Sequence, residues 1–173
     1  MNKQYADAHP EEKRIHGIGW LPANWNDSPL PTKESLDKAI PDRPVYLICA
    51  DVHTFWMNSM ALKEAGITPD MKLKSGEVGV DEKGELNGLL FEPEAFEPAM
   101  AKVMEFPEEN IKDIHRNFLR YLAQYGITSV SDMSSDDYTE ITMKNYSVMK
   151  NMEEELTSRI HLYTRLVGYT DFS

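Results

Sequence analysis

The sequence predicts an α/β fold, and three observations carry that prediction. The second half of the chain alternates helical and strand patterns, an apolar run occupies residues 45–50, and turn residues separate two strand-like runs within 76–91. Alternating helices and strands are typical of parallel α/β units. The length of 173 residues and the 41% hydrophobic composition suit a globular chain with a sizeable core.

The first half of the chain predicts short elements. Residues 21–31, with three prolines and Trp25, favour an ordered loop, and Thr32 is expected to cap a helix that stops at Pro41. The remaining elements are expected as a strand over 15–20, a buried strand over 45–50, a helix over 56–65 with Gly66 at its C-terminal end, and a hairpin over 76–91 that turns at 81–84.

The second half predicts one long helix and then alternating elements. Pro107 suits the first turn of a helix that buries an apolar stripe, namely Ile111, Ile114, Phe118, Leu122 and Tyr125, and Gly126 caps it. A strand over 127–130, a helix over 138–156 and a strand over 159–167 are expected to follow. A parallel sheet usually covers its last strand, so we expect the chain to be a fragment of a larger protein.

Charge and composition exclude several classes of partner. The formal net charge of -11 and the pI near 4.9 argue against binding to nucleic acid or an anionic membrane, since both would be repelled. No apolar run approaches the roughly 20 residues of a membrane span. The single cysteine, Cys49, excludes an intrachain disulfide and fits a reducing compartment, so we expect a cytoplasmic protein.

The most informative motif follows the buried strand. Asp51, His53, Trp56 and Asn58 supply a carboxylate, a proton carrier, an aromatic wall and an amide within eight residues. They are expected at the mouth of a parallel strand, where α/β proteins place ligand-contacting groups, although an ordinary strand-to-helix turn with Trp56 in the core fits equally well. Glu92 also ends a strand, where it faces either a cleft or solvent.

Other motifs are absent or favour structural roles. The five histidines show no metal-binding spacing, and the sequence has neither a glycine-rich phosphate loop nor the glycine-flanked serine of serine hydrolases. His115, on the long helix, is expected to have a structural role. Asp132, at the end of a strand, is expected to cap the helix that follows.

Several sequence blocks occur in a specific order. They are Gly19-Trp20 with Trp25, Leu30-Pro31-Thr32, Pro41-Asp42-Arg43-Pro44-Val45, Asp51-x-His53 with Trp56-x-Asn58-Ser59-x-x-Leu62, and Gly126-Ile127-Thr128-Ser129-Val130. In this order the chain resembles the family 3 branch of the amidohydrolase superfamily. The resemblance implies a metal-dependent hydrolase on a TIM-like barrel, in which one or two divalent ions, zinc being the expected ion, activate water against a carbon-nitrogen bond.

The resemblance also implies how the chain divides. Residues 1–95 would form a lid-like α/β insertion subdomain with a hairpin, and residues 96–173 a partial barrel of two units. The family's metal ligands would lie outside this chain, so we expect the metal in the full-length parent and none bound here. Ser131 stands where the family often has a histidine. The residues expected to bind substrate are Trp20, Asp51, His53, Trp56, Asn58 and Glu92.

Three functional hypotheses remain open from the sequence. The first is a fragment of a metal-dependent amidohydrolase with a small-molecule amide substrate, inactive alone and able to self-associate through exposed barrel edges. The second is a stand-alone binding module that has lost catalysis. The third is a metal-free hydrolase that uses His53 with Asp51 or Glu92 for acid-base chemistry.

Overall fold

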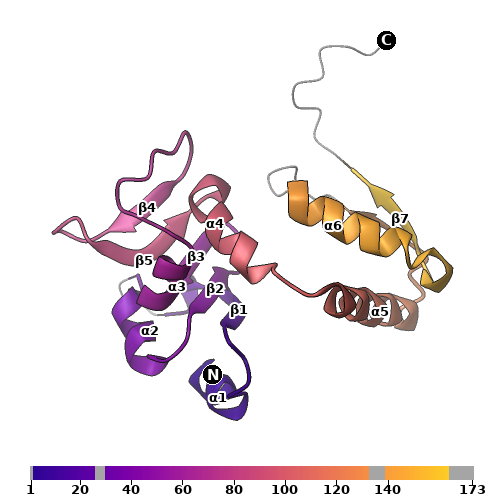
Figure 1. Cartoon of the computed structure of the whole chain (residues 1–173), viewed down its shortest axis with the longest axis horizontal. Coiled ribbons are helices and arrows are strands. Elements are labelled where there is room, and N and C mark those ends of the chain that lie inside the picture. The colour runs from indigo at the N-terminus through magenta and orange to yellow at the C-terminus, as the bar shows by residue number, and fades with distance from the viewer. Residues whose placement is uncertain (1, 26–29, 133–138, 164–173) are drawn as a thin grey trace, which may run out of the picture. The chain divides into compact units, whose positions relative to one another are not determined.

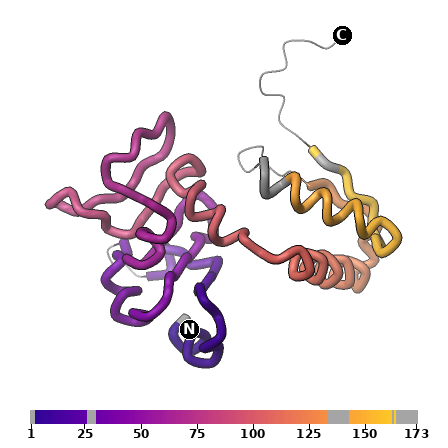
Figure 2. The backbone as a smooth tube through the Cα atoms, viewed as in Figure 1, coloured from indigo at the N-terminus to yellow at the C-terminus, as the bar shows by residue number. Residues whose placement is uncertain are grey.

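A computed structural model describes residues 2–25, 30–132 and 139–163. The chain divides into two compact units, Met1–Val103 and Met104–Ser173. Figure 1 labels their helices and strands, and Figure 2 follows the backbone from one unit into the other through residues 104–107, where no helix or strand continues.

The first unit is built on a five-stranded mixed sheet. In spatial order its strands are β1 (Ile15–Trp20), β2 (Val45–Cys49), β3 (Thr54–Met57), β5 (Leu86–Phe91) and β4 (Glu77–Val80). β1 and β2 run parallel, whereas β3 is antiparallel to β2 and β5, and β4 is antiparallel to β5. The predicted strands at 15–20 and 45–50 and the hairpin over 76–91 are confirmed.

Helices pack on the sheet because its side chains alternate between two apolar faces. The helices of this unit are α1 (Asn2–Ala8), α2 (Lys33–Ala39), α3 (Ser59–Glu64) and α4 (Pro93–Val103), with a short 3-10 helix at Pro22–Asn24. Tyr46, Phe55 and Leu90 pack in one core with Ala61 of α3 and Phe96 of α4.

A second core contains residues of α1, α2, β1 and β2 together with Ile40, which directly follows α2; its members are Ala6, Ile15, Leu36, Ile40, Val45 and Leu47. Thr32 precedes α2 as predicted, but its side chain makes no capping hydrogen bond.

The prediction of a single helix over 56–65 is wrong in its first part. Phe55 and Met57 are buried in the core with α3 and α4, whereas Trp56 packs against the other core, which is the alternation of a strand. Residues 54–57 therefore form β3, and the helix begins only at Ser59. As a result, Asp51 and His53 lie in the turn of an antiparallel hairpin and not between a strand and a helix.

Two helices of this unit, α1 and α4, were not predicted from the sequence. α4 contains Pro98, a residue that usually interrupts helices, yet Phe96, Ala99 and Val103 are buried at helical spacing. That spacing was the available signal for this helix.

The second unit has the predicted order of helix, strand, helix and strand. It consists of α5 (Glu108–Gln124), β6 (Ser129–Asp132), α6 (Thr139–Lys150), a 3-10 helix at Glu153–Glu155, and β7 (Arg159–Leu162). β6 and β7 pair in parallel, from Ser129 opposite Arg159 to Asp132 opposite Leu162. α6 ends six residues before the predicted 156, and the predicted strand residues 164–167 lie outside the described residues.

Asp132 is the last residue of β6, and residues 133–138, which follow it, lie outside the described residues, so its expected role as a helix cap stays a prediction. The predicted stripe on α5 is only partly buried. Ile111 and Leu122 are buried, as is Leu119, but Ile114 and Phe118 are each 50% exposed and Tyr125 is 66% exposed. The described elements that pack on α5 therefore bury only part of the apolar stripe, and the rest of the stripe is exposed.

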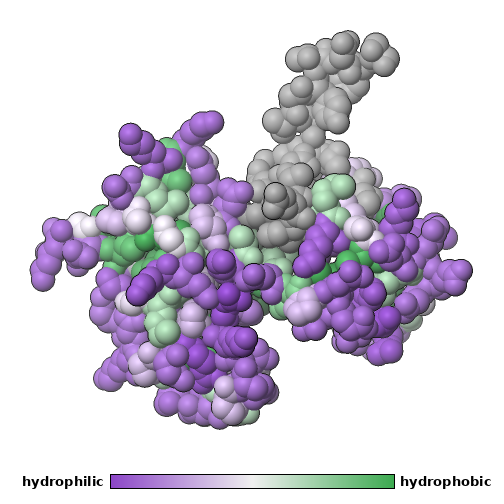
Figure 3. All heavy atoms as spheres, viewed as in Figure 1, coloured by the Kyte–Doolittle hydropathy of each residue, from purple (hydrophilic) through white to green (hydrophobic). Residues whose placement is uncertain are grey.

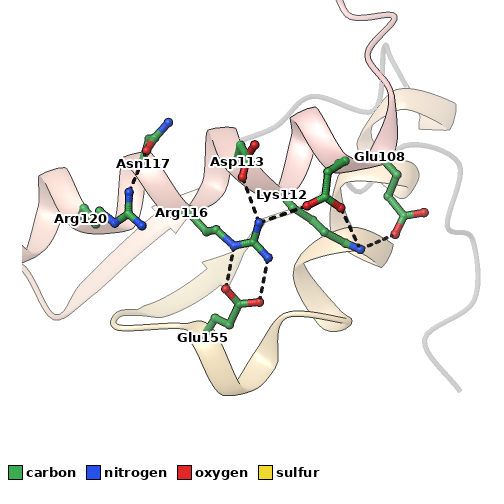
Figure 4. Close-up of polar contacts among 8 residues, drawn as sticks. Glu108, Lys112, Asp113, Arg116, Asn117, Arg120 and Glu155 are labelled. Atoms are coloured by element: carbon green, nitrogen blue, oxygen red, sulfur yellow. Dashed lines mark hydrogen bonds and ion pairs between the residues drawn. The ribbon is translucent and has the colours of Figure 1, made fainter.

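Charged side chains join α5 to the 3-10 helix before β7 (Figure 4). Arg116 donates to both carboxylate oxygens of Glu155, at 2.8 and 3.2 Å, and to Asp113 at 3.0 Å. Lys112 pairs with Glu108 at 3.1 Å. The carboxylates are exposed and the two cations are partly exposed, so these ion pairs fix the local arrangement more than they stabilise the fold.

The described residues thus confirm a mixed α/β architecture, with one five-stranded and one two-stranded sheet and no closed barrel among them. On the face drawn in Figure 3, hydrophilic residues cover most of the surface of both units. Within the described ranges, every helix is too short or too polar to cross a membrane.

Candidate functional site

Four of the predicted site residues gather at one edge of the five-stranded sheet. β1, β2 and β5 run in the same direction, because β3 is antiparallel to both β2 and β5. Trp20 ends β1, Asp51 and His53 follow β2, and Glu92 follows β5. We call this the carboxyl edge, and in open α/β sheets such edges commonly hold ligands.

Backbone hydrogen bonds tie the three segments of the carboxyl edge together. The N–H of Ala50 donates to the carbonyl of Trp20 at 2.9 Å, and the N–H of Glu92 donates to the carbonyl of His53 at 2.9 Å. The edge is therefore a connected piece of the sheet, although its turn residues are exposed.

His53 is held by three hydrogen bonds. Its backbone N–H donates to Oδ1 of Asp51 at 2.9 Å, an Asx turn, and its carbonyl accepts from Glu92. Its ring nitrogen Nδ1 lies 3.0 Å from Oε2 of Glu92. Since a carboxylate only accepts, Nδ1 carries the proton of this bond. The imidazole is 58% exposed, and its Nε2 has no partner in the part of the chain that the structure describes.

The electrostatics of the carboxyl edge favour a protonated imidazole. The hydrogen bond that the imidazole donates to Glu92, and then the negative charge of Glu92, raise the pKa of His53 above its usual value. The N–H of His53 in turn lowers the pKa of Asp51. With Nδ1 committed to Glu92, a neutral imidazole presents a lone pair at Nε2 and a protonated one presents an N–H there. The group can therefore accept or donate a proton toward a ligand oxygen.

Two residues of the carboxyl edge have strained backbones. Val52 has φ of 57° and Glu92 has φ of 68°, in the left-handed region that non-glycine residues rarely adopt. Val52 is β-branched, and Glu92 precedes a proline, so both positions are unfavourable by about 1–3 kcal/mol each. Such outliers cluster at functional sites. Here they orient the side chains that flank His53.

All three tryptophans of the chain form one cluster. The ring centroids of Trp20, Trp25 and Trp56 lie 5.7, 5.8 and 6.0 Å apart, with Trp56 edge-on to the other two. The indole N–H of Trp20 donates to the carbonyl of Leu47 at 3.1 Å, and that of Trp56 to Thr32 at 2.9 Å. With these two N–H groups satisfied, the half-buried rings of Trp20 and Trp56 offer apolar contact only. Trp25 was not among the predicted site residues. A tryptophan in a proline-rich loop needs other side chains to pack against, and this was the signal in the sequence that could have indicated its place in the cluster.

Asn58 occupies a different environment from the other predicted site residues. It is fully buried, and its Oδ1 accepts from Val45 and Ala61 at 3.0 and 2.9 Å, the second bond capping α3. Its Nδ2 donates to the carbonyls of Ile40 and Arg43 at 3.3 and 2.8 Å. The amide is saturated, so this geometry supports a role in fixing the loop before β2 and gives no support to substrate contact.

The residues present do not fit a metal centre. Within residues 2–25, 30–132 and 139–163, no group of three or more His, Cys, Asp or Glu side chains could hold an ion. Asp51 and Glu92 each already bind His53, through its backbone and its ring.

Comparisons with known proteins give a consistent family. The model of an amidohydrolase family matches residues 1–168. The putative amidohydrolase YtcJ of Bacillus subtilis is 38% identical over 86 residues, which cover 48% of this chain and 16% of that protein. The N-substituted formamide deformylase of Arthrobacter pascens is 30% identical over 130 residues, which cover 71% of this chain and 23% of that protein.

Solved structures show the same fold. An uncharacterized metal-dependent hydrolase from Pyrococcus horikoshii matches with a TM-score of 0.56 and 21% identity, over 88% of this chain and 28% of its own. One from Pyrococcus furiosus matches with a TM-score of 0.54 and 23% identity, over 88% and 29%. The chain thus spans less than a third of the length of each of these four proteins.

Proposed function

Since this chain belongs to the amidohydrolase family, we propose that it is part of a metal-dependent hydrolase that cleaves a carbon-nitrogen bond in a small-molecule amide. The observation that carries the proposal is the family match over nearly the whole chain, and the N-substituted formamide deformylase among its relatives supports the bond type. The metal, with zinc the expected ion, would be held by residues of the full-length parent beyond this chain, and this chain alone would be inactive.

In this proposal the first unit is a lid-like subdomain that contributes the substrate-facing side, and the second unit is a segment of a barrel. His53 presents Nε2 to the carbonyl oxygen of the amide, and its protonated form, favoured by Glu92, donates a hydrogen bond to that oxygen as negative charge develops on it. Asp51 and Glu92 position the imidazole. Trp20 and Trp56 supply an apolar wall for the substituent on the amide nitrogen.

Titration of the isotopically labelled chain with N-phenylformamide, followed by NMR, tests the substrate contact. We expect chemical-shift changes at residues 50–54, at Glu92 and at the indole N–H groups, without hydrolysis. His53→Gln keeps a hydrogen-bonding side chain but loses the imidazole, so it should weaken these changes. His161→Gln, an exposed histidine of β7, is the matched control and should leave them intact. Shifts absent from the carboxyl edge, or unaltered by His53→Gln, would refute the role of His53.

The fragment proposal has its own tests. Hydrolysis of an amide by the purified chain with stoichiometric zinc would contradict it. The flanking coding sequence decides between the fragment and the alternative, a stand-alone binding module without catalysis. A His-x-His motif upstream with a lysine and two histidines downstream would support the hydrolase, and a reading frame of these 173 residues alone would support the binding module.

A further inference from the structure

The two-stranded sheet of the second unit has one polar, solvent-exposed face. Val130 and Ile160 are half-buried on the side of α5 and α6, where both border a hollow with residues of these helices. Side chains alternate along a strand, so the residues on either side of Val130 and Ile160 belong to the opposite face. Four exposed polar side chains lie there, namely Ser129, Ser131, Arg159 and His161, and we call them the open face.

The pairing of the strands brings the four side chains of the open face together. Ser129 is opposite Arg159 and Ser131 is opposite His161 in the parallel register. Neighbouring strands lie about 4.8 Å apart, so each hydroxyl is beside one nitrogen-bearing side chain of the next strand. The N–H of Arg159 donates to the carbonyl of Thr128 at 2.9 Å, which fixes this register where β7 begins. Parallel sheets usually bury both faces under apolar side chains, so an open polar face is unusual.

The polar groups of the open face have no partners among the described residues. The guanidinium of Arg159, the imidazole of His161 and the two serine hydroxyls make no hydrogen bond or ion pair there. Every other arginine that the structure describes donates to a partner: Arg14 to Glu64, Arg43 to the carbonyl of Ala6, Arg116 to Glu155 and Arg120 to Asn117. The open face therefore presents a permanent positive charge whose five N–H donors are free for a ligand.

The charges around the open face favour a ligand with a single negative charge. Asp132 lies on the side of α5, where its charge acts on His115, and Glu155 pairs with Arg116. Neither of these carboxylates pairs with Arg159. A monoanion matches the one permanent charge of Arg159, whereas a dianion would be repelled more strongly by a chain of net charge -11.

We propose that the open face binds a small monocarboxylate. The planar guanidinium of Arg159 donates two parallel hydrogen bonds to the carboxylate, the geometry in which this pair is strongest. His161 and the hydroxyls of Ser129 and Ser131 donate to the lone pairs that remain. The site lies in the second unit and uses none of the residues assigned to amide binding at the carboxyl edge, so it stands independently of the proposed function.

Three probes of one planar shape and different charge test the proposal on the full chain. Binding of benzoate, benzamide and benzamidine, which are anionic, neutral and cationic, is measured by NMR titration of residues 127–131 and 158–163. We expect benzoate to bind at least about tenfold more tightly than benzamide, as hydrogen bonds to a charged group allow, and benzamidine to leave these signals unchanged. Equal affinity for benzoate and benzamide, no binding of benzoate, or tighter binding of inorganic phosphate than of benzoate would overturn the proposal.

The variant Arg159→Gln removes the guanidinium and keeps a hydrogen-bonding side chain. It should lower the affinity for benzoate to that for benzamide, and Arg159→Lys, which keeps the charge without the planar fork, should give an intermediate affinity. The matched control is Arg120→Gln on α5, which changes the net charge of the chain by the same amount and should retain the tenfold preference. A preference that survives Arg159→Gln would contradict the assignment. The comparison of the three probes on the unaltered chain does not depend on any variant.

Discussion

Replacement of Asn58 by alanine should destabilise the first unit more than the replacement of any other asparagine or glutamine side chain in that unit. The side chain makes four hydrogen bonds, to Val45, Ala61, Ile40 and Arg43, and it is fully buried. At roughly 1 kcal/mol for each hydrogen bond, one of them a helix cap, the loss amounts to about 4 kcal/mol. Since domains are typically stable by about 5–15 kcal/mol, the variant should fold only marginally.

Urea unfolding followed by tryptophan fluorescence measures this loss. All three tryptophans lie in the first unit, so the signal reports on that unit. A loss of about 4 kcal/mol should lower the urea midpoint by roughly 1.3–4 M, since the slope in urea is typically about 1–3 kcal/mol per M. The control is Asn87→Ala, because Asn87 is half-buried and makes two hydrogen bonds, to Val80 and Leu89. If Asn58→Ala costs no more than Asn87→Ala, the inference that Asn58 anchors the loop is refuted.

Three further changes test the geometry of the first unit. Glu92→Gln should lower the pKa of His53, which NMR titration measures. In the unaltered chain, the stabilisation of the fold by the His53–Glu92 pair is complete below the pKa of His53 in the unfolded chain. It is lost as the pH rises through the higher pKa of His53 in the folded chain. Val52→Gly should leave stability unchanged or raise it by about 1 kcal/mol, because glycine relieves the left-handed strain; a clear loss in urea unfolding would contradict that strain. Gly88→Ala should cost at least about 3 kcal/mol, since its Cβ would lie 2.6 Å from the carbonyl oxygen of Met57, whereas Gly84→Ala, with open space around it, should cost about 1 kcal/mol in the same assay.

Elements specified by local pattern could be predicted from the sequence. The 3.6-residue spacing of α5, the strand that follows it and the hairpin turn at 81–84 all depend on neighbouring residues. The boundary between β3 and α3 could not be placed in this way, because Trp56 and Met57 fit both periods. Only pairing of β3 with two other strands decides in favour of the strand.

The candidate site shows the same limit. His53 and Asp51 are two residues apart, so their relationship followed from the sequence, and Glu92 was weighed as an acid-base partner of His53. Their hydrogen bond nevertheless joins residues 39 positions apart and depends on the register that pairs Thr54 with Phe91. The saturation of Asn58 likewise depends on backbone groups of Ile40 and Arg43, which no local pattern places beside it.

The single thiol of the chain gives experimental access to motions at the carboxyl edge. Cys49 ends β2, two residues before Asp51, and it is buried, and burial raises the pKa of its thiol. Alkylating reagents attack the thiolate, so the folded edge should protect Cys49 from them. The rate of alkylation under native conditions then measures how often the end of β2 opens, and the same measurement with an amide ligand added would show whether binding at His53 keeps it closed.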